Sequence, residues 1–288
     1  MPFAPHILFP VDFSERCRAV RPCVIAMAQH FRTKVTLMHV IQVPLAWYGG
    51  VEAAPVMFDV PAMTDDAREH LDAFLGSPEP AIEVEPVVEH GDPAACIAGY
   101  AEQQGVGMIM MPTHGYGRFR SLLLGSVTAK VLHDAKCAVW TSAHTEDPGL
   151  AGRAEFKNIL CAVGLEPENS GLICYAANLA RSFKAQLRLV HAVSFAETHP
   201  RGFLDTEFSQ GLFQVSREAI AARQQEAGTD APVFLEVGGV SSVVRTAAQQ
   251  FDADLVVIGR GRLHETLGRL RTNAYAIIRD SPCPVMSV

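Results

Sequence analysis

The sequence predicts an α/β protein of two tandem doubly wound domains, each with a mainly parallel five-stranded sheet flanked by helices. Three observations lead to this prediction. Short apolar runs alternate with helical patterns along the chain. Several of the runs are apolar on both faces, which is typical of parallel strands covered by helices on each side. The second half of the chain also repeats the first, and its 288 residues fit two domains of ordinary size.

The elements of the first half can be assigned in chain order. Runs of strand length read HILFPV, KVTLMHVIQV, IEVEPVV, GMIMMP and CAVWTS. Helical periodicity is found between them, over residues 16–31, 64–76, 93–104 and 125–135. In a sheet of this kind, ligands bind at the carboxyl ends of the strands, near the point where the strand order reverses.

The repeat is visible without gaps over residues 6–40 and 158–192. A later segment, 89–112, parallels 236–259 in the same way. A repeat of this length indicates a duplicated domain rather than a solenoid. The polar segment between the halves contains proline and glycine, so we expect domains at 1–145 and 155–288. Identical residues at equivalent positions include Ile7 and Ile159, Leu8 and Leu160, Val11 and Val163, Phe31 and Phe183, and His39 and His191.

Composition excludes several classes of function. The formal net charge of −7 argues against a nucleic-acid-binding protein, which needs a basic face. No apolar run approaches the roughly 20 residues of a membrane span, and we identify no signal peptide. The seven cysteines are scattered, odd in number and never spaced as CxxC, which favours a cytoplasmic protein with reduced thiols and makes a zinc site a poor candidate.

Candidate binding residues follow the predicted strands of the first half. Asp12 follows the first strand and Val40 lies near the end of the second. The cluster from Met111 to Gly115 ends the fourth strand, and Gly125-Ser126-Val127 opens the next helix. We expect Ser126 to cap that helix with its hydroxyl group. A helix start with a preceding glycine favours an anion, and Asp12 offers an acceptor to a base amino group or a ribose hydroxyl, so the set describes a mononucleotide site.

Familiar catalytic and phosphate-binding motifs are missing from the sequence. It contains no GxxxxGK[ST] phosphate loop and no GxSxG nucleophile elbow, and GYGRFR lacks the third glycine of a dinucleotide fingerprint. We therefore expect a protein that is not an enzyme. His39 and His191 occupy equivalent strand positions, which favours a structural role with a hydrogen-bonded ring. Cys17 and Cys23 are expected to serve as packing residues.

The end of the first half resembles the universal stress protein family. The motif runs Pro112-Thr-His-Gly115, nine residues, then Gly125-Ser126, and the resemblance covers both halves. It implies a stress-response or signalling protein that binds ATP with Mg²⁺ without substantial turnover, and that forms a homo-oligomer or an intramolecular pseudo-dimer through the last strands. It implies that Pro10, Asp12 and Val40 border the base and that Met111, Gly115, Gly125, Ser126 and Val127 hold the ribose and phosphates. From its charge and position we add Arg118 as a phosphate contact.

The second half departs from this motif. Gly164 replaces Asp12, Ala192 replaces Val40, Arg262 replaces Gly115, and Thr272-Asn273 replaces Gly125-Ser126. We expect helix-cap chemistry to survive at Thr272 or Asn273 but the nucleotide site to be lost.

Two alternatives stay open for the whole protein. One is a nucleotide-free interaction module, which is favoured by the altered second half and by the proline at 112, where the best-known ATP binders have glycine. The other is an ATP-consuming enzyme.

Overall fold

The computed structural model describes residues 6–42, 59–76, 82–113, 124–142, 156–193, 206–260 and 269–288, and the side chains of all of these except 206–210 and 269–272. The chain divides into two compact units. The first is built mainly from Met1–Trp140 and the second mainly from Glu155–Val288.

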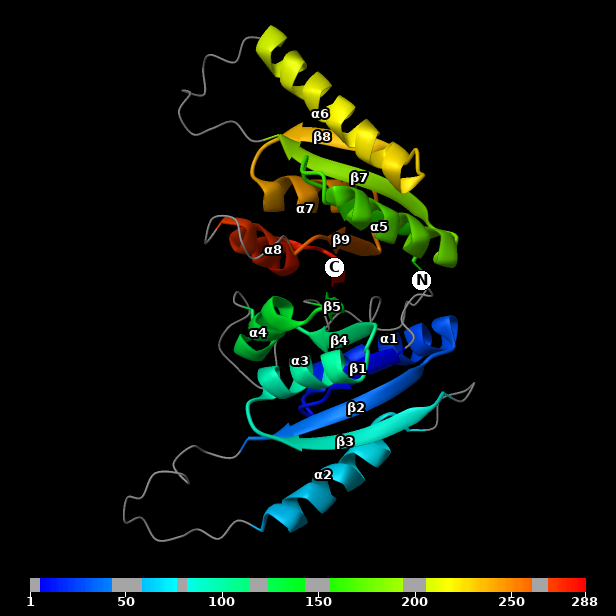
Figure 1. Cartoon of the computed structure of the whole chain (residues 1–288), viewed down its shortest axis with the longest axis vertical. Coiled ribbons are helices and arrows are strands. Elements are labelled where there is room, and N and C mark those ends of the chain that lie inside the picture. The colour runs from blue at the N-terminus through cyan, green and yellow to red at the C-terminus, as the bar shows by residue number, and fades with distance from the viewer. Residues whose placement is uncertain are drawn as a thin grey trace, which may run out of the picture. The chain divides into compact units, whose positions relative to one another are not determined.

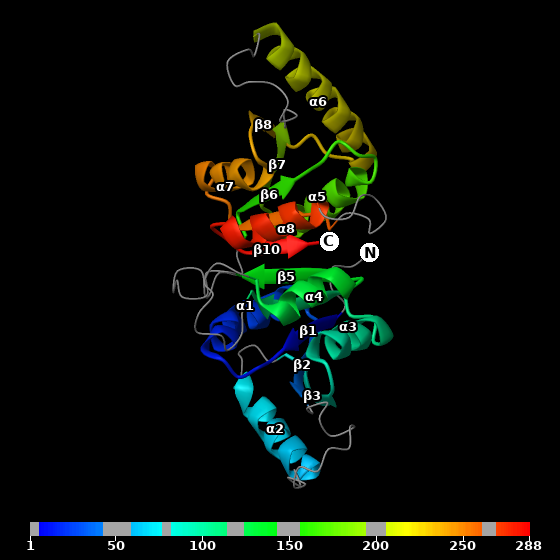
Figure 2. The same cartoon turned by 90° about the vertical axis from the view of Figure 1, so that its left-hand side faces the viewer.

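The first unit is a doubly wound α/β domain (Figure 1). Its strands lie in the order β3-β2-β1-β4-β5, with β1 parallel to both β2 and β4. Helices α1 and α2 lie on one face of the sheet, while α3 and α4 pack together on the other (Figure 2). The elements are β1 (His6–Pro10), α1 (Glu15–Phe31), β2 (Lys34–Ile41), α2 (Val60–Phe74), β3 (Val84–His90), α3 (Pro93–Gln103), β4 (Met108–Pro112), α4 (Ser126–Asp134) and β5 (Ala138–Ser142).

The second unit repeats this arrangement, with strand order β10-β9-β6-β7-β8. Here β6 is parallel to β7 and β9, α5 packs with α6, and α7 packs with α8. The predicted α/β fold is therefore confirmed in both halves. The elements are β6 (Asn158–Ala162), α5 (Asn169–Phe183), β7 (Gln186–Val193), α6 (Thr206–Ala227), β8 (Val233–Val237), α7 (Val240–Gln250), β9 (Leu255–Ile258), α8 (Arg269–Asp280) and β10 (Val285–Ser287).

Local capping residues explain where the helices of the first unit begin. The Ser14 hydroxyl accepts a hydrogen bond from the Cys17 amide at 3.2 Å, which starts α1. Asp59 accepts from the Ala62 amide at 3.0 Å, and a proline stands in the first turn, so α2 begins at Val60 rather than at residue 64. Over the ranges that the structure describes, no helix is long and apolar enough to cross a bilayer.

The two equivalent histidines have the structural role that the repeat predicts. His39 Nδ1 donates to the Val11 carbonyl oxygen at 2.7 Å, and His191 Nδ1 donates to the Val163 carbonyl oxygen at 2.8 Å. Each bond joins the second strand of a unit to the residue that follows its first strand. Both rings therefore fix the backbone at the carboxyl end of the central strand.

The cysteines of α1 pack in the core, as predicted. Cys17 and Cys23 are both buried, and neither forms a disulfide. Burial, and after it the nearby charge of Asp12, raises the pKa of Cys17 to about 12. This thiol therefore stays protonated at neutral pH and behaves as a small apolar side chain.

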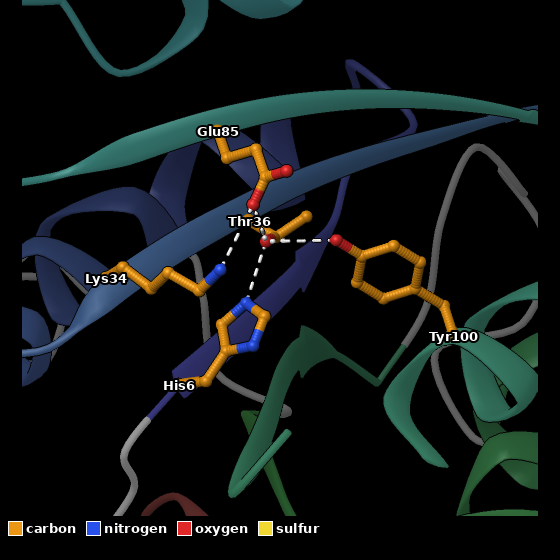
Figure 3. A network of polar contacts seen from close by, with 5 residues as sticks. All are labelled: His6, Lys34, Thr36, Glu85 and Tyr100. Carbon is orange, nitrogen blue, oxygen red and sulfur yellow. Dashed lines mark hydrogen bonds and ion pairs between the residues drawn. The ribbon is translucent and has the colours of Figure 1, made fainter. Parts of the chain in front are cut away.

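A polar network connects the strands of the first unit with α3 (Figure 3). His6 Nε2 lies 2.7 Å from Thr36 Oγ1, and both residues are buried. The same hydroxyl donates to Glu85 Oε2 at 3.4 Å and lies 3.5 Å from the Tyr100 hydroxyl. Lys34 Nζ pairs with that Glu85 oxygen at 3.3 Å. The network joins β1, β2, β3 and α3 through one threonine hydroxyl.

This network makes a pH-dependent contribution to stability that we expect to depend on His6. Burial, followed by the charge of Lys34, lowers the pKa of His6 from its ordinary value of 6.5, while Glu85 acts in the opposite direction. Below pH 6.5, His6 therefore binds a proton more readily in the unfolded chain than in the folded unit. The free energy of unfolding should accordingly fall as the pH falls below 6.5. The free energy of unfolding can be measured with urea at about pH 7 and at about pH 5. Its decrease between the two pH values should be smaller for His6→Gln than for the unaltered protein. Equal losses would contradict this assignment.

Candidate nucleotide site

The predicted site lies where the strand order of the first unit reverses. From β1 the chain continues to β2 and β3 on one side, and β4 and β5 lie on the other. The register pairs Leu8 with Ile109 and Pro10 with Met38, and the Val11 amide donates to the Met38 carbonyl oxygen at 2.8 Å. The carboxyl ends of β1 and β4 thus meet at the switch point, where doubly wound sheets bind ligands.

Asp12 is held in a tight turn at this edge. Its Oδ1 accepts a hydrogen bond from the Ser14 amide at 3.0 Å, and its side chain is half-buried. This bond engages one carboxylate oxygen and fixes the side chain relative to the start of α1. A carboxylate has acceptor capacity for further donors, such as an amino or hydroxyl group of a ligand.

The start of α4 is anchored to the end of β4. The Gly125 amide donates to the Thr113 carbonyl oxygen at 2.9 Å, and Thr128 Oγ1 donates to the Pro112 carbonyl oxygen at 3.2 Å. A helix start leaves its first amides without acceptors inside the helix and attracts negative charge. The two bonds therefore hold the start of α4, which favours anions, at the end of β4. Strand β4 is the neighbour of β1, which leads to Asp12.

The predicted capping role of Ser126 is wrong. Gly125 is the cap residue, with φ −59° and ψ 143°, and its carbonyl oxygen accepts from the Ala129 amide at 2.8 Å. The helical hydrogen-bond ladder thus begins at Gly125, which leaves exposed Ser126 as the first residue inside the helix. Among the residues that the structure describes, no side chain caps α4, so its first amides remain available to solvent or to a ligand.

The structure brings several of the predicted residues to one edge. Buried Pro10 ends β1, buried Met111 is the last but one residue of the neighbouring β4, and Val40 is half-buried near the end of β2. Half-buried Val127 lies in the first turn of α4. Gly115 and Arg118 lie outside the described residues, so their predicted contacts remain predictions.

Sequence reasoning assigned no role to two threonines at this edge. Thr113 and Thr128 are both buried, and both take part in the contacts that join β4 to α4. Thr128 is a polar residue on the buried side of a short helix, and that position is the signal that could have identified it. The partner of its hydroxyl, the Pro112 carbonyl, is 16 residues away and carries no signal in the sequence.

The equivalent position in the second unit is filled by its own side chains. The Gly164 amide donates to Asn169 Oδ1 at 3.1 Å, and Asn169 Nδ2 donates to Glu166 Oε2 at 3.1 Å. A Cβ atom added to Gly164 would overlap Glu166 Oε2. The Glu166 carboxylate therefore occupies space next to Gly164 that the side chain of Asp12 takes in the first unit.

The expected helix cap of the second unit is wrong. Helix α8 begins at Arg269, so Thr272 and Asn273 lie inside the helix and cannot cap it. Arg262 lies outside the described residues. Across the part of the chain that the structure describes, no three His, Cys, Asp or Glu side chains form a group that could hold a metal ion.

The chain is similar in sequence to one family over both of its halves. The model of the universal stress protein family matches residues 4–142 and 155–288. Universal stress protein A of Salmonella typhi is 30% identical over 109 residues, which cover 36% of this chain and 75% of that protein. Universal stress protein A homolog 1 of Coxiella burnetii is 28% identical over 142 residues, 46% of this chain and 96% of that protein.

Solved structures share the fold over nearly the whole chain. A protein of unknown function from Pseudomonas aeruginosa PAO1 has a TM-score of 0.67 and 18% identity, covering 99% of this chain and 92% of its own. A universal stress protein from Archaeoglobus fulgidus has a TM-score of 0.65 and 21% identity, covering 98% and 95%. Both the family match and these structures extend over the two halves, so the chain belongs to the universal stress protein family and carries two tandem domains of that family.

Proposed function

We propose that the first unit binds one adenine nucleotide, ATP, and that the second unit binds none. The observation that carries the proposal is the 2.9 Å bond between the Gly125 amide and the Thr113 carbonyl. It holds the start of α4 at the end of β4, next to the strand that leads to Asp12. A carboxylate acceptor and an anion-favouring helix start at one switch point match the two ends of a nucleotide.

The residues of this edge can be assigned to parts of the ligand. Asp12 would accept from a base amino group or a ribose hydroxyl, while Pro10 and Val40 would border the adenine. Met111 would lie against the ribose. Gly115, Arg118, Gly125, Ser126 and Val127 complete the proposed set on the phosphate side. Mg²⁺ would accompany the triphosphate, because it bridges phosphate oxygens and needs few protein ligands.

We propose binding without substantial turnover. A general base must lie within hydrogen-bond reach of the attacking water, and no side chain of the proposed set is assigned to that task. Family members are generally non-catalytic and often bind adenine nucleotides. In this proposal the protein acts in the cytoplasm in a stress response or in signalling, and ATP occupancy changes its stability or its choice of partner.

The test is to identify the small molecules that the freshly purified protein releases on denaturation, by mass spectrometry and HPLC. We expect about one ATP or ADP per chain, and saturation at 100 Kd should stabilise the binding unit by about 2.7 kcal/mol. Two nucleotides per chain would contradict the assignment of the second unit. None, together with an unchanged melting temperature in ATP and Mg²⁺, would favour a nucleotide-free interaction module.

We also propose that the chain associates through the last strand of a half. The last strands of the halves, with AVW and PVM in their sequences, are short and apolar. Free strand edges invite pairing, so we propose that such a strand pairs either within the chain, as a pseudo-dimer, or between chains, as a homo-oligomer. Light scattering and crosslinking that found a monomer with independent halves would contradict this proposal.

A further inference from the structure

Phe13, which directly follows Asp12, has an uncommon backbone conformation. Its φ is 60°, in the left-handed region that bulky side chains rarely adopt. Such a conformation persists only where the surrounding structure holds it, and it is found preferentially at functional sites.

Three rings from other elements hold the Phe13 ring. Its centroid lies 4.7 Å from that of His39 in β2, with the ring planes at 37°. The rings of His70 and Phe74, both in α2, lie 5.6 and 6.0 Å away in edge-on geometry. Arg21 of α1 donates to the Phe74 carbonyl oxygen at 2.9 Å, which fixes the end of α2. Together these contacts form a clamp, consisting of His39, His70 and Phe74, around Phe13.

The residues on both sides of Asp12 are fixed as well. The carbonyl oxygen of Val11 accepts from His39 Nδ1, so the ring that contacts Phe13 also holds the residue before Asp12. On the other side, the Ser14 amide donates to the Asp12 carboxylate. The clamp thus acts on the turn that orients the carboxylate.

The second unit provides a comparison within the same chain. At the positions equivalent to Asp12 and Phe13 it has Gly164 and Leu165. Leu165 does not adopt a positive φ, although His191 keeps the same bond to Val163. The fold therefore forms without the strained residue. The strain occurs in the unit that has a carboxylate at this position and not in the unit that has lost it.

We propose that Phe13 is a positioning residue, which through the clamp orients the Asp12 carboxylate toward the nucleotide. This inference rests on the proposed function of the first unit. It also assigns a role to α2, which reaches the site through His70 and Phe74 rather than through a side chain of the predicted set.

Phe13→Gly tests the inference by removing the ring while allowing the same backbone angle, because glycine adopts positive φ without penalty. We expect binding of ATP with Mg²⁺, measured by isothermal titration calorimetry, to weaken about five- to tenfold, since the loop must then be ordered on binding. The matched control is Leu165→Gly, at the equivalent loop position of the second unit, which should leave the affinity unchanged.

A double-mutant cycle separates positioning from a general structural role. If Phe13 acts through the carboxylate, Phe13→Gly should have little further effect in an Asp12→Ala background. Equal losses in both backgrounds would overturn the inference, as would an unchanged affinity of a folded Phe13→Gly protein. Should that variant fail to fold, Phe13→Leu, which keeps an apolar side chain but loses the ring contacts, carries the same cycle. If the unaltered protein does not bind ATP at all, the proposed function fails, and that result is seen before any variant is measured.

Discussion

Replacement of Asp12 by alanine is expected to weaken binding of ATP with Mg²⁺ by about 10- to 100-fold, because a hydrogen bond to a charged group contributes about 1.5–3 kcal/mol. The variant removes the acceptor that follows β1, the strand beside β4. Calorimetric titration gives the dissociation constant directly. The rise in melting temperature on adding ATP should shrink in the same variant.

Two controls sharpen the Asp12 test. Asp12→Asn keeps an oxygen acceptor for the Ser14 amide but loses the charge, so its affinity should lie between those of the unaltered protein and Asp12→Ala. Glu166→Ala alters the equivalent corner of the second unit and should leave the affinity unchanged. A dissociation constant that stays the same in Asp12→Ala would remove Asp12 from the site.

Replacement of Phe9 by alanine is expected to destabilise the first unit by about 3–5 kcal/mol. Phe9 lies in β1 with no exposed surface, and its ring centroid is 6.0 Å from that of Phe74. The variant would leave a cavity between the central strand and α2, which also carries the clamp around Phe13. Urea unfolding followed by circular dichroism measures the loss, and the melting temperature of the unit should fall by about 10 °C or more.

Phe9→Leu is the matched control for this prediction. It keeps most of the apolar volume and should cost less than about 1.5 kcal/mol. The equivalent residue of the second unit is Cys161, also fully buried, so the two cores are filled differently at this position. Similar stabilities of Phe9→Ala and the unaltered protein would show that the β1–α2 contact is not part of the core.

The sequence predicted the elements of the fold because their signals are local. Apolar runs at strand length and helical periodicity depend on near neighbours in the chain, and the strands and helices of the first half were found where these signals lie. The start of α2 was placed too late, because Asp59 and its capping bond to Ala62 precede the apolar pattern. The paired histidines His39 and His191 were predicted correctly because the repeat itself supplied a comparison.

The candidate site was predicted less completely, because its geometry depends on which distant groups meet. Sequence reasoning placed the cap of α4 on Ser126, whereas the ladder begins at Gly125. The expectation that Thr272 or Asn273 caps the corresponding helix failed because α8 begins earlier, at Arg269. Helix boundaries of this kind depend on the path of the preceding loop, which leaves no periodic pattern.

The sequence by itself determined the duplicated α/β fold, the family resemblance, and the presence of Asp12 and Gly125 in only the first half. The tertiary structure alone decided that Phe13 adopts a left-handed backbone conformation, with its ring packed against β2 and α2. It also decided that the Glu166 carboxylate lies beside Gly164. The physical reason is the range of the interactions. Strand and helix patterns arise from residues a few positions apart, whereas His39 and His70 meet Phe13 across 26 and 57 positions, and only the packed fold brings them together.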